Sequence, residues 1–326
     1  MRPLRLAAVG GFVLVGGWFA GPRVPTELHL EPVTVPADPD GWVEARESRF
    51  DDVRPGSEAL LRWIDPDRRA PTPLSFVYVH GYTAGRQELA PLVDSLAERF
   101  GANVFYTRLT GHGRTPDAMR EASLRAWTRD VREAIALGSR IGERVVLIGT
   151  SNGGALAAWA AALDEFDGVL AATVLVSPNL GPRDWRGELL DGPWGLPLTR
   201  LIVGDYYTYE VRNPRHGAAW MTRSAVEGLP HMTASVRLAR AVVDDSLTAP
   251  VQVHYSTADQ VVAPDRIAAW VSELRAPRTE AVVYGELEDP GNHVLAGEIL
   301  APSNTRAVLE TIAAFLRDEV GLGQGY

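Results

Sequence analysis

The sequence contains no cysteine and no lysine, so all 32 basic residues among its 326 positions are arginines. Without cysteine the chain cannot form disulfides, cysteine nucleophiles, iron–sulfur clusters or thiolate zinc sites. Without lysine it cannot form a Schiff base with pyridoxal phosphate or supply the lysine of a phosphate-binding P-loop. Several large enzyme classes are thereby excluded, and we expect neither a metal nor a cofactor.

The 32 arginines are outnumbered by 41 acidic residues, and the formal net charge is −9 at pH 7. Binding to phosphate backbones needs a local surplus of positive charge, so we expect no nucleic-acid partner. Apolar residues make up 46% of the chain, and glycine and proline are only moderately frequent. This composition predicts a globular protein with a large core.

The N-terminus, residues 1–23, has the pattern of a targeting segment. Arg2 and Arg5 precede an uncharged stretch from Leu6 to Pro22, which is short for a membrane span and long enough for a signal-peptide core. Bulky Trp18 disfavours cleavage after Ala20. We therefore expect an uncleaved signal anchor that attaches the protein to a membrane, with the rest of the chain exported. The alternative is a cytoplasmic protein with an apolar N-terminal helix.

The rest of the chain is expected to divide into four parts. Residues 24–72 begin with the proline-rich, acidic stretch "VPTELHLEPVTVPADPD" and are predicted to form a linker and N-terminal strands. Residues 73–178 and 249–326 are predicted to form the two parts of one core. Residues 179–248 show no clear strand pattern, are rich in Trp, Tyr, Gly and Pro, and are predicted to form a lid inserted between core strands.

Within the core, apolar runs rich in β-branched residues alternate with stretches of helical periodicity, such as "LRAWTRDVREAIALGSRI". Most of the runs are continuous rather than alternating, as expected for strands buried on both faces of a parallel sheet. The order predicts an α/β fold with a doubly wound, mostly parallel sheet. The expected strands are residues 74–81, 103–111, 144–150, 171–178, 250–259 and 279–286.

The segment "VVLIGTSNGG" matches the pattern G-x-S-x-G at Gly149, Ser151 and Gly153, between a buried strand and a helix. A tight strand-to-helix turn needs small flanking residues and projects the serine hydroxyl above the sheet. Ser151 could instead be a simple helix N-cap, but that role would not require glycines on both sides. We therefore expect Ser151 to be a nucleophile.

A serine nucleophile needs a histidine base and a carboxylate that orients it, and the order in this fold is serine, acid, histidine. His293 lies in "EDPGNHVLAGE", after the last expected strand, and Asp259 ends the strand in "VQVHYSTADQVVAP". The other histidines considered lie before Ser151, inside a strand or in the lid. The lesser candidates are His80, His112, His216, His231 and His254 as base, and Asp244, Asp245, Glu286, Glu288 and Asp289 as acid.

Acyl transfer also needs donors that face the developing oxyanion. The backbone N–H of Asn152, directly after the nucleophile, is expected to supply one. The backbone N–H of Tyr82, in the loop "VHGYTAG" after the first core strand, is expected to supply the other. That loop alone could equally be an ordinary strand exit.

Together, "VYVHGYTAG", "RLTGHG", "VVLIGTSNGGALA", "STADQVVAP" and "NHVLAG" resemble the α/β-hydrolases of the bacterial carboxylesterase and monoacylglycerol-lipase type. The resemblance covers residues 73 to 317, interrupted by the lid. It implies a triad of Ser151, His293 and Asp259 and an oxyanion hole from Tyr82 and Asn152. Family members commonly carry Met or Gln where this chain has Asn152.

The function expected from these observations is hydrolysis of carboxylic esters through an acyl-enzyme, with an apolar acyl or glyceride-like substrate. Prolyl-aminopeptidase-like peptidases, thioesterases and acyltransferases use the same triad and remain alternatives. A further alternative is a catalytically silent, membrane-tethered interaction module, although no triad residue is missing. The sequence does not indicate an oligomeric state.

Overall fold

The computed structural model describes residues 21–35, 37–243 and 247–320. Residues 1–20 of the predicted signal anchor lie outside the described residues, as do Asp244 and Asp245. None of the helices within the described ranges is both long enough and apolar enough to cross a bilayer.

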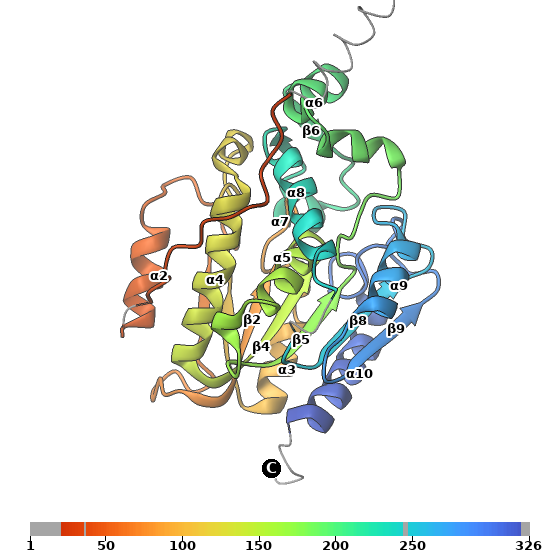
Figure 1. The fold of residues 1–326 in the computed structure, drawn as a ribbon. Coiled ribbons are helices and arrows are strands. Elements are labelled where there is room, and N and C mark those ends of the chain that lie inside the picture. Colours follow the sequence, from red (N-terminus) through yellow and green to blue (C-terminus); the bar gives the residue numbers. More distant parts are fainter. Residues whose placement is uncertain (1–20, 36, 244–246, 321–326) are drawn as a thin grey trace, which may run out of the picture.

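A seven-stranded sheet forms the centre of the molecule (Figure 1). Its strand order is β1-β3-β2-β4-β5-β8-β9; β1 is antiparallel to β3 and all other neighbours are parallel. The expected α/β class with a mostly parallel sheet is therefore confirmed. The strands are β1 (Leu60–Arg62), β2 (Thr72–Val79), β3 (Asn103–Tyr106), β4 (Gly142–Thr150), β5 (Leu170–Val176), β8 (Val251–Ser256) and β9 (Thr279–Tyr284).

The continuous apolar runs form strands because helices cover both faces of the sheet. Side chains alternate across a strand, so Val77 and Leu147 enter one core cluster while Phe76 and Val146 enter another. The first cluster packs against α4, α5, α8 and α9, and the second against α3 and α10. The helices are α2 (Pro39–Glu47), α3 (Leu92–Phe100), α4 (Leu124–Ile141), α5 (Asn152–Ala161), α6 (Gly195–Val203), α7 (Pro214–Ala219), α8 (Gly228–Arg240), α9 (Pro264–Glu273) and α10 (Pro302–Val320).

The strand order reverses at β2. The chain runs from β2 to β3 on one side and then returns to β4 on the other side. At such a switch point the loops after neighbouring strands diverge and leave a crevice at the carboxyl edge of the sheet. The loops after β2, β4, β8 and β9 carry the predicted site residues to this edge.

The segment between β5 and β8 contains α6, α7 and α8 and lies above the carboxyl edge of the sheet (Figure 1). It also contains a short antiparallel pair, β6 (Tyr206–Thr208) with β7 (Arg223–Ala225). The sequence showed no strand here, because three-residue strands are too short to display an alternating pattern.

Residues 22–35 are extended chain that lies along the molecule rather than away from it (Figure 1). Arg132 of α4 donates to the carbonyl of Glu31 at 2.9 Å, and Val35 is buried. Beyond this segment the structure forms helix α2, where the sequence was expected to give linker and strands. Asp38 caps α2 through the N–H of Gly41, so the end of the acidic, proline-rich stretch, residues 38–40, forms a helix N-terminus, whereas residues 24–35 of it are extended chain.

Candidate active site

Ser151 lies in the tight turn between β4 and α5, with φ 52° and ψ −116°. Non-glycine residues rarely adopt such a conformation, and it turns the side chain out of the strand path. The N–H of Ser151 donates to the carbonyl of Val176 at 3.0 Å, and its own carbonyl accepts from Asn179 at 2.9 Å. The elbow is therefore held by the end of the neighbouring strand β5.

The flanking glycines are required by close packing. A Cβ on Gly149 would lie 2.5 Å from the carbonyl oxygen of Gly153, and a Cβ on Gly153 would lie 2.2 Å from the carbonyl oxygen of Val79. Only glycine allows α5 to begin this close to β2. The observed packing explains the G-x-S-x-G spacing physically.

His293 joins Ser151 and Asp259 into one hydrogen-bonded chain. Its Nε2 lies 3.0 Å from Ser151 Oγ, and its Nδ1 lies 2.8 Å from Asp259 Oδ2. The other oxygen of Asp259 accepts from the N–H groups of Val261 and Val262 at 2.7 and 2.9 Å. Asp259 is fully buried, so its carboxylate is held rigidly against the imidazole.

The loop that carries His293 is held by Asp289, which belongs to the same loop, and by Ser177, which follows β5. Asp289 Oδ2 accepts from the N–H groups of His293 and Val294 at 2.9 and 3.0 Å, and Ser177 Oγ donates to the carbonyl of His293 at 2.7 Å. Asp289, a lesser acid candidate from the sequence, thus bonds to the backbone of this loop and not to the imidazole.

Other candidate bases and acids from the sequence have side-chain partners away from the Ser151–His293–Asp259 chain or lie in the inserted segment. Buried His254 in β8 bonds to Gln252 and Tyr284, and Glu288 accepts from Ser303. His216 and His231 lie in α7 and α8 of the inserted segment.

The loop after β2 brings Tyr82 next to the nucleophile. A Cβ on Gly81 would lie 3.2 Å from Ser151 Cβ, which shows how closely this turn approaches the elbow. Within the described part of the chain, the N–H of Tyr82 donates to no other group, and Asn152 is the first residue of α5, where N–H groups lack helical acceptors. Both N–H groups are thus available to an external acceptor.

His80 is hydrogen-bonded to the backbone of this turn and to the backbone of a neighbouring loop. The N–H of Leu109 donates to His80 Nε2 at 3.1 Å, and His80 Nδ1–H donates to the carbonyl of Gly81 at 2.8 Å. Burial lowers the pKa of His80 to about 4, so the ring is neutral and keeps this tautomer at physiological pH. His80 is therefore a structural support for the loop of Tyr82.

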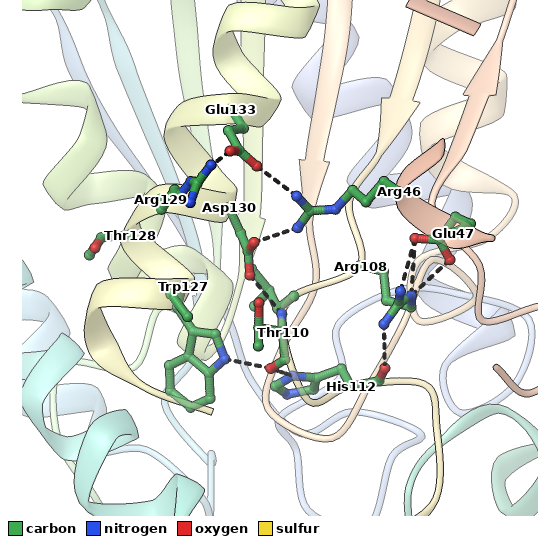
Figure 2. Close-up of polar contacts among 12 residues, drawn as sticks. Arg46, Glu47, Arg108, Thr110, His112, Trp127, Thr128, Arg129, Asp130 and Glu133 are labelled. Carbon is green, nitrogen blue, oxygen red and sulfur yellow. Dashed lines mark hydrogen bonds and ion pairs between the residues drawn. The ribbon is translucent and has the colours of Figure 1, made fainter. Parts of the chain in front are cut away.

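The ring of Tyr82 rests edge-on against His112 and Trp127, with centroid distances of 5.7 and 6.2 Å. Figure 2 shows how this support is fixed: the carbonyl of Thr110 accepts from Trp127 Nε1 at 2.8 Å, and the N–H of Thr110 donates to Asp130. Arg46 of α2 pairs in turn with Asp130 and with Glu133. An ionic network thus connects α2 to the aromatic base beneath Tyr82.

The electrostatics around His293 favour its protonated form. Burial acts against the charge, but the carboxylates of Asp259, Glu88 and Asp289 outweigh it and raise the pKa of the imidazole. The side chain of His293 is 12% exposed, and Ser151 as a residue is 9% exposed. The site is therefore largely shielded from water, where such charges interact strongly.

The inserted segment contacts both loops of the site. Tyr209 OH lies 2.9 Å from Thr83 Oγ1, and Trp220 packs in one apolar cluster with Ala84 and Val294. On the other side, Ser235 of α8 bonds to the side-chain amide of Asn152. The side chain of Asn152, to which the sequence assigned no role, therefore contacts the inserted segment.

Two buried acids near the site, Glu88 and Asp289, have contacts that the sequence did not indicate. Glu88 belongs to "RQELAPLVDSL", in the loop that precedes α3, where a solvated position is the ordinary expectation for a glutamate. Asp289 belongs to "EDPGN", which has the composition of any surface turn. Across the described residues, no three His, Asp or Glu side chains are grouped to hold a metal ion.

The sequence matches a family model described as serine aminopeptidase, S33, over residues 72–288. No curated protein matches the chain. A solved structure of the metagenome-derived lipolytic enzymes LipS and LipT is 24% identical, with a TM-score of 0.62, and covers 82% of this chain and 99% of its own.

A Paleococcus ferrophilus monoacylglycerol lipase is 17% identical, with a TM-score of 0.57, and covers 77% of this chain and 97% of its own. A soluble variant of the Saccharomyces cerevisiae monoglyceride lipase is 10% identical, with a TM-score of 0.62 and coverages of 80% and 91%. These likenesses concern the fold. Because the family model spans more than half of the sequence, the chain belongs to the serine aminopeptidase S33 family of α/β-hydrolases.

Proposed function

We propose that the protein is a serine hydrolase that cleaves carboxylic esters, with Ser151 as nucleophile, His293 as base and Asp259 as its orienting acid. The observation that carries the proposal is the hydrogen-bonded chain from Ser151 Oγ through His293 to Asp259 Oδ2. This arrangement activates a hydroxyl that is otherwise a poor nucleophile.

In the proposed reaction, Ser151 Oγ attacks the ester carbonyl while His293 Nε2 takes its proton. The backbone N–H groups of Tyr82 and Asn152 stabilise the oxyanion of the tetrahedral intermediate. The imidazolium then protonates the leaving alkoxide, which departs as the alcohol and leaves the acyl group on Ser151. Water, activated by His293, hydrolyses the acyl-enzyme and restores the free hydroxyl.

Ester hydrolysis is favoured over aminopeptidase activity by the charges of the inserted segment. An aminopeptidase must capture a substrate ammonium group, and free carboxylates in the lid are the groups we expect to do so. In residues 179–243, however, each carboxylate is paired with an arginine. Glu188 pairs with Arg240 and Arg266, and Glu227 pairs with Arg120 and Arg200. The aromatic contacts of the segment with the oxyanion loop favour an apolar acyl group.

The decisive experiment is a substrate series on the purified protein: p-nitrophenyl esters of increasing chain length, matched thioesters and aminoacyl amides. We expect turnover of the esters and none of the amides. Ser151→Ala should abolish turnover and labelling by a fluorophosphonate probe while its circular dichroism spectrum stays unchanged. Ester turnover that survives this substitution would refute the proposal, and preferential amide turnover would favour the peptidase alternative.

We also propose that a membrane holds the protein through residues 1–23, with the catalytic part outside the cytoplasm. The support is the apolar sequence after Arg2 and Arg5 and the position of residue 22, whose carbonyl accepts from Trp194 beside α6. Leu201 and Ile202 of α6 are 81% and 64% exposed, so this face is apolar. Fractionation of the full chain against a fragment beginning at Val24 tests this, and recovery of the full chain in the soluble fraction would support the cytoplasmic alternative.

A further inference from the structure

Glu88 is a buried carboxylic acid next to the candidate site, and the mechanism above leaves it without a role. It is only 4% exposed, and no arginine forms an ion pair with it in the described parts of the chain. Its Oε2 accepts from the hydroxyl of Tyr78 at 2.7 Å and from the N–H of Gly81 at 2.8 Å. Burying a carboxyl group without a cation is costly, so this position needs an explanation.

The carboxyl group lies directly behind the turn that approaches the nucleophile. A Cβ on Gly81 would lie 2.8 Å from Glu88 Oε1 and 3.2 Å from Ser151 Cβ, so Gly81 separates the two side chains. A Cβ on Gly297 would lie 2.3 Å from the carbonyl oxygen of Glu88. Glu88 therefore lies between two loops: its side chain approaches the loop of Tyr82, and its backbone approaches the loop of His293.

The carboxylates whose charges act on His293 come from three loops. They are Asp259 from the loop after β8, Glu88 from the loop after β2, and Asp289 from the loop of His293 itself. The pKa of Glu88 is raised on balance, because the effect of burial exceeds the opposite effects of the N–H of Gly81, the hydroxyl of Tyr78 and the charge of His293. The charge of Glu88 also contributes to raising the pKa of Tyr209 in the inserted segment.

We propose that Glu88 is a positioning residue that holds the Gly81–Tyr82 turn against Ser151 and supports the imidazolium form of His293 by its negative charge. This inference rests on the proposed function. When His293 takes the proton of Ser151, the new positive charge forms near two further carboxylates besides Asp259. Glu88 neither gains nor loses a proton during the cycle, and it touches no reacting atom.

Two substitutions separate the two parts of this role. In Glu88→Gln the amide oxygen can still accept from Gly81 and Tyr78, so the turn keeps its position while the charge is lost. We expect the plateau kcat to stay within roughly threefold of wild type, because the donors remain aligned. The pKa of His293 should fall, because a nearby negative charge is removed.

In Glu88→Ala the N–H of Gly81 loses its acceptor, and the turn is free to move. We expect kcat to fall roughly 10- to 100-fold at every pH. If this variant fails to fold, Glu88→Asp replaces it, because the shorter side chain keeps the charge but draws it away from Gly81. Glu298→Gln is the matched control: its side chain is 57% exposed and pairs with Arg215, so neither kcat nor the pH profile should change.

The pKa of His293 is measured in two ways: from the acid limb of kcat/KM for a p-nitrophenyl ester, and by NMR titration of the imidazole, assigned with His293→Ala. Equal His293 pKa values in wild type and Glu88→Gln would overturn the charge effect. Wild-type kcat in Glu88→Ala, or in Glu88→Asp where that replaces it, would overturn the positioning effect. If the wild-type protein hydrolyses no ester, the proposed function fails, and the NMR titration still decides the inference about charge.

Discussion

Asp259→Asn tests most sharply whether the hydrogen-bonded chain works as a triad. Oδ1 of Asp259 accepts from two backbone N–H groups, those of Val261 and Val262, at 2.7 and 2.9 Å. Only the oxygen of an asparagine can accept these bonds, so its NH₂ group must face His293 Nδ1. The imidazole is then forced to carry its proton on Nε2, where it donates to Ser151 instead of accepting the hydroxyl proton.

The size of the effect follows from the same contacts. Turning the amide over would leave two buried N–H groups without acceptors, at about 1–3 kcal/mol each, or about 2–6 kcal/mol in total. The variant also loses the carboxylate that stabilises the imidazolium. We therefore expect kcat/KM to fall by roughly 10,000-fold, about 5.5 kcal/mol, with little change in thermal stability.

Steady-state hydrolysis of a p-nitrophenyl ester measures this loss, and thermal unfolding shows whether the variant is folded. Asp289→Asn is the matched control, since Asp289 is also buried but bonds only to backbone N–H groups of the His293 loop. We expect the control to retain activity within roughly tenfold of wild type. The triad assignment would be refuted if Asp259→Asn kept more than about a tenth of wild-type activity. It would also be refuted if the control were as inactive as Asp259→Asn.

Three further predictions concern pH, the α2 network and the elbow. The surrounding carboxylates raise the pKa of His293 above 6.5, and only the neutral imidazole can accept a proton. We therefore expect kcat/KM to fall as the pH drops through a midpoint above 6.5. A pH–rate profile with a lower midpoint would contradict this. Arg46→Met should destabilise the fold by about 2–4 kcal/mol in urea unfolding, because buried Asp130 loses its arginine and keeps only the N–H of Thr110. Arg129→Met, at a side chain 72% exposed, should cost less than about 1 kcal/mol, because Glu133 keeps its pair with Arg46. Equal losses in the two variants would count against the network. Gly153→Ala places a Cβ 2.2 Å from a backbone oxygen and should yield little folded protein. Gly154→Ala, whose Cβ would lie 3.0 Å from its nearest neighbouring atom, should fold with a smaller loss of thermal stability. Comparable unfolding temperatures for the two variants would show that the elbow does not need glycine at position 153.

Much of the core could be predicted from local patterns. The continuous runs that became β2, β4, β5 and β8 carry their own signal, because a strand buried on both faces must be apolar at every position. The predictions failed where the sequence pattern was too short to show a period or was common to two kinds of structure. Helix α2 was missed because Asp38 and Pro39 are as common in linkers as at helix N-termini, and the pair β6–β7 is too short to show a period.

The residues of the hydrogen-bonded chain could be named in advance because each follows or ends a recognisable strand. Ser151, Asp259 and His293 occur in the order expected of an α/β-hydrolase, and the glycines beside Ser151 mark the turn. Their catalytic roles stay predictions until the variants above are measured.

The sequence alone determined the α/β class, the mostly parallel sheet and the candidates for nucleophile, base and acid, because apolar periodicity and chain order are properties of neighbouring residues. The tertiary structure alone decided that Glu88 lies behind Gly81, that Asp289 holds the loop of His293, and that Asn152 contacts Ser235. Asn152 and Ser235 are 83 residues apart, whereas Glu88 and Asp289 bond within their own loops, 7 and 4 residues from Gly81 and His293. The side chains in these contacts are polar types that are ordinarily solvated, so only the packing of whole elements could bury them next to the site.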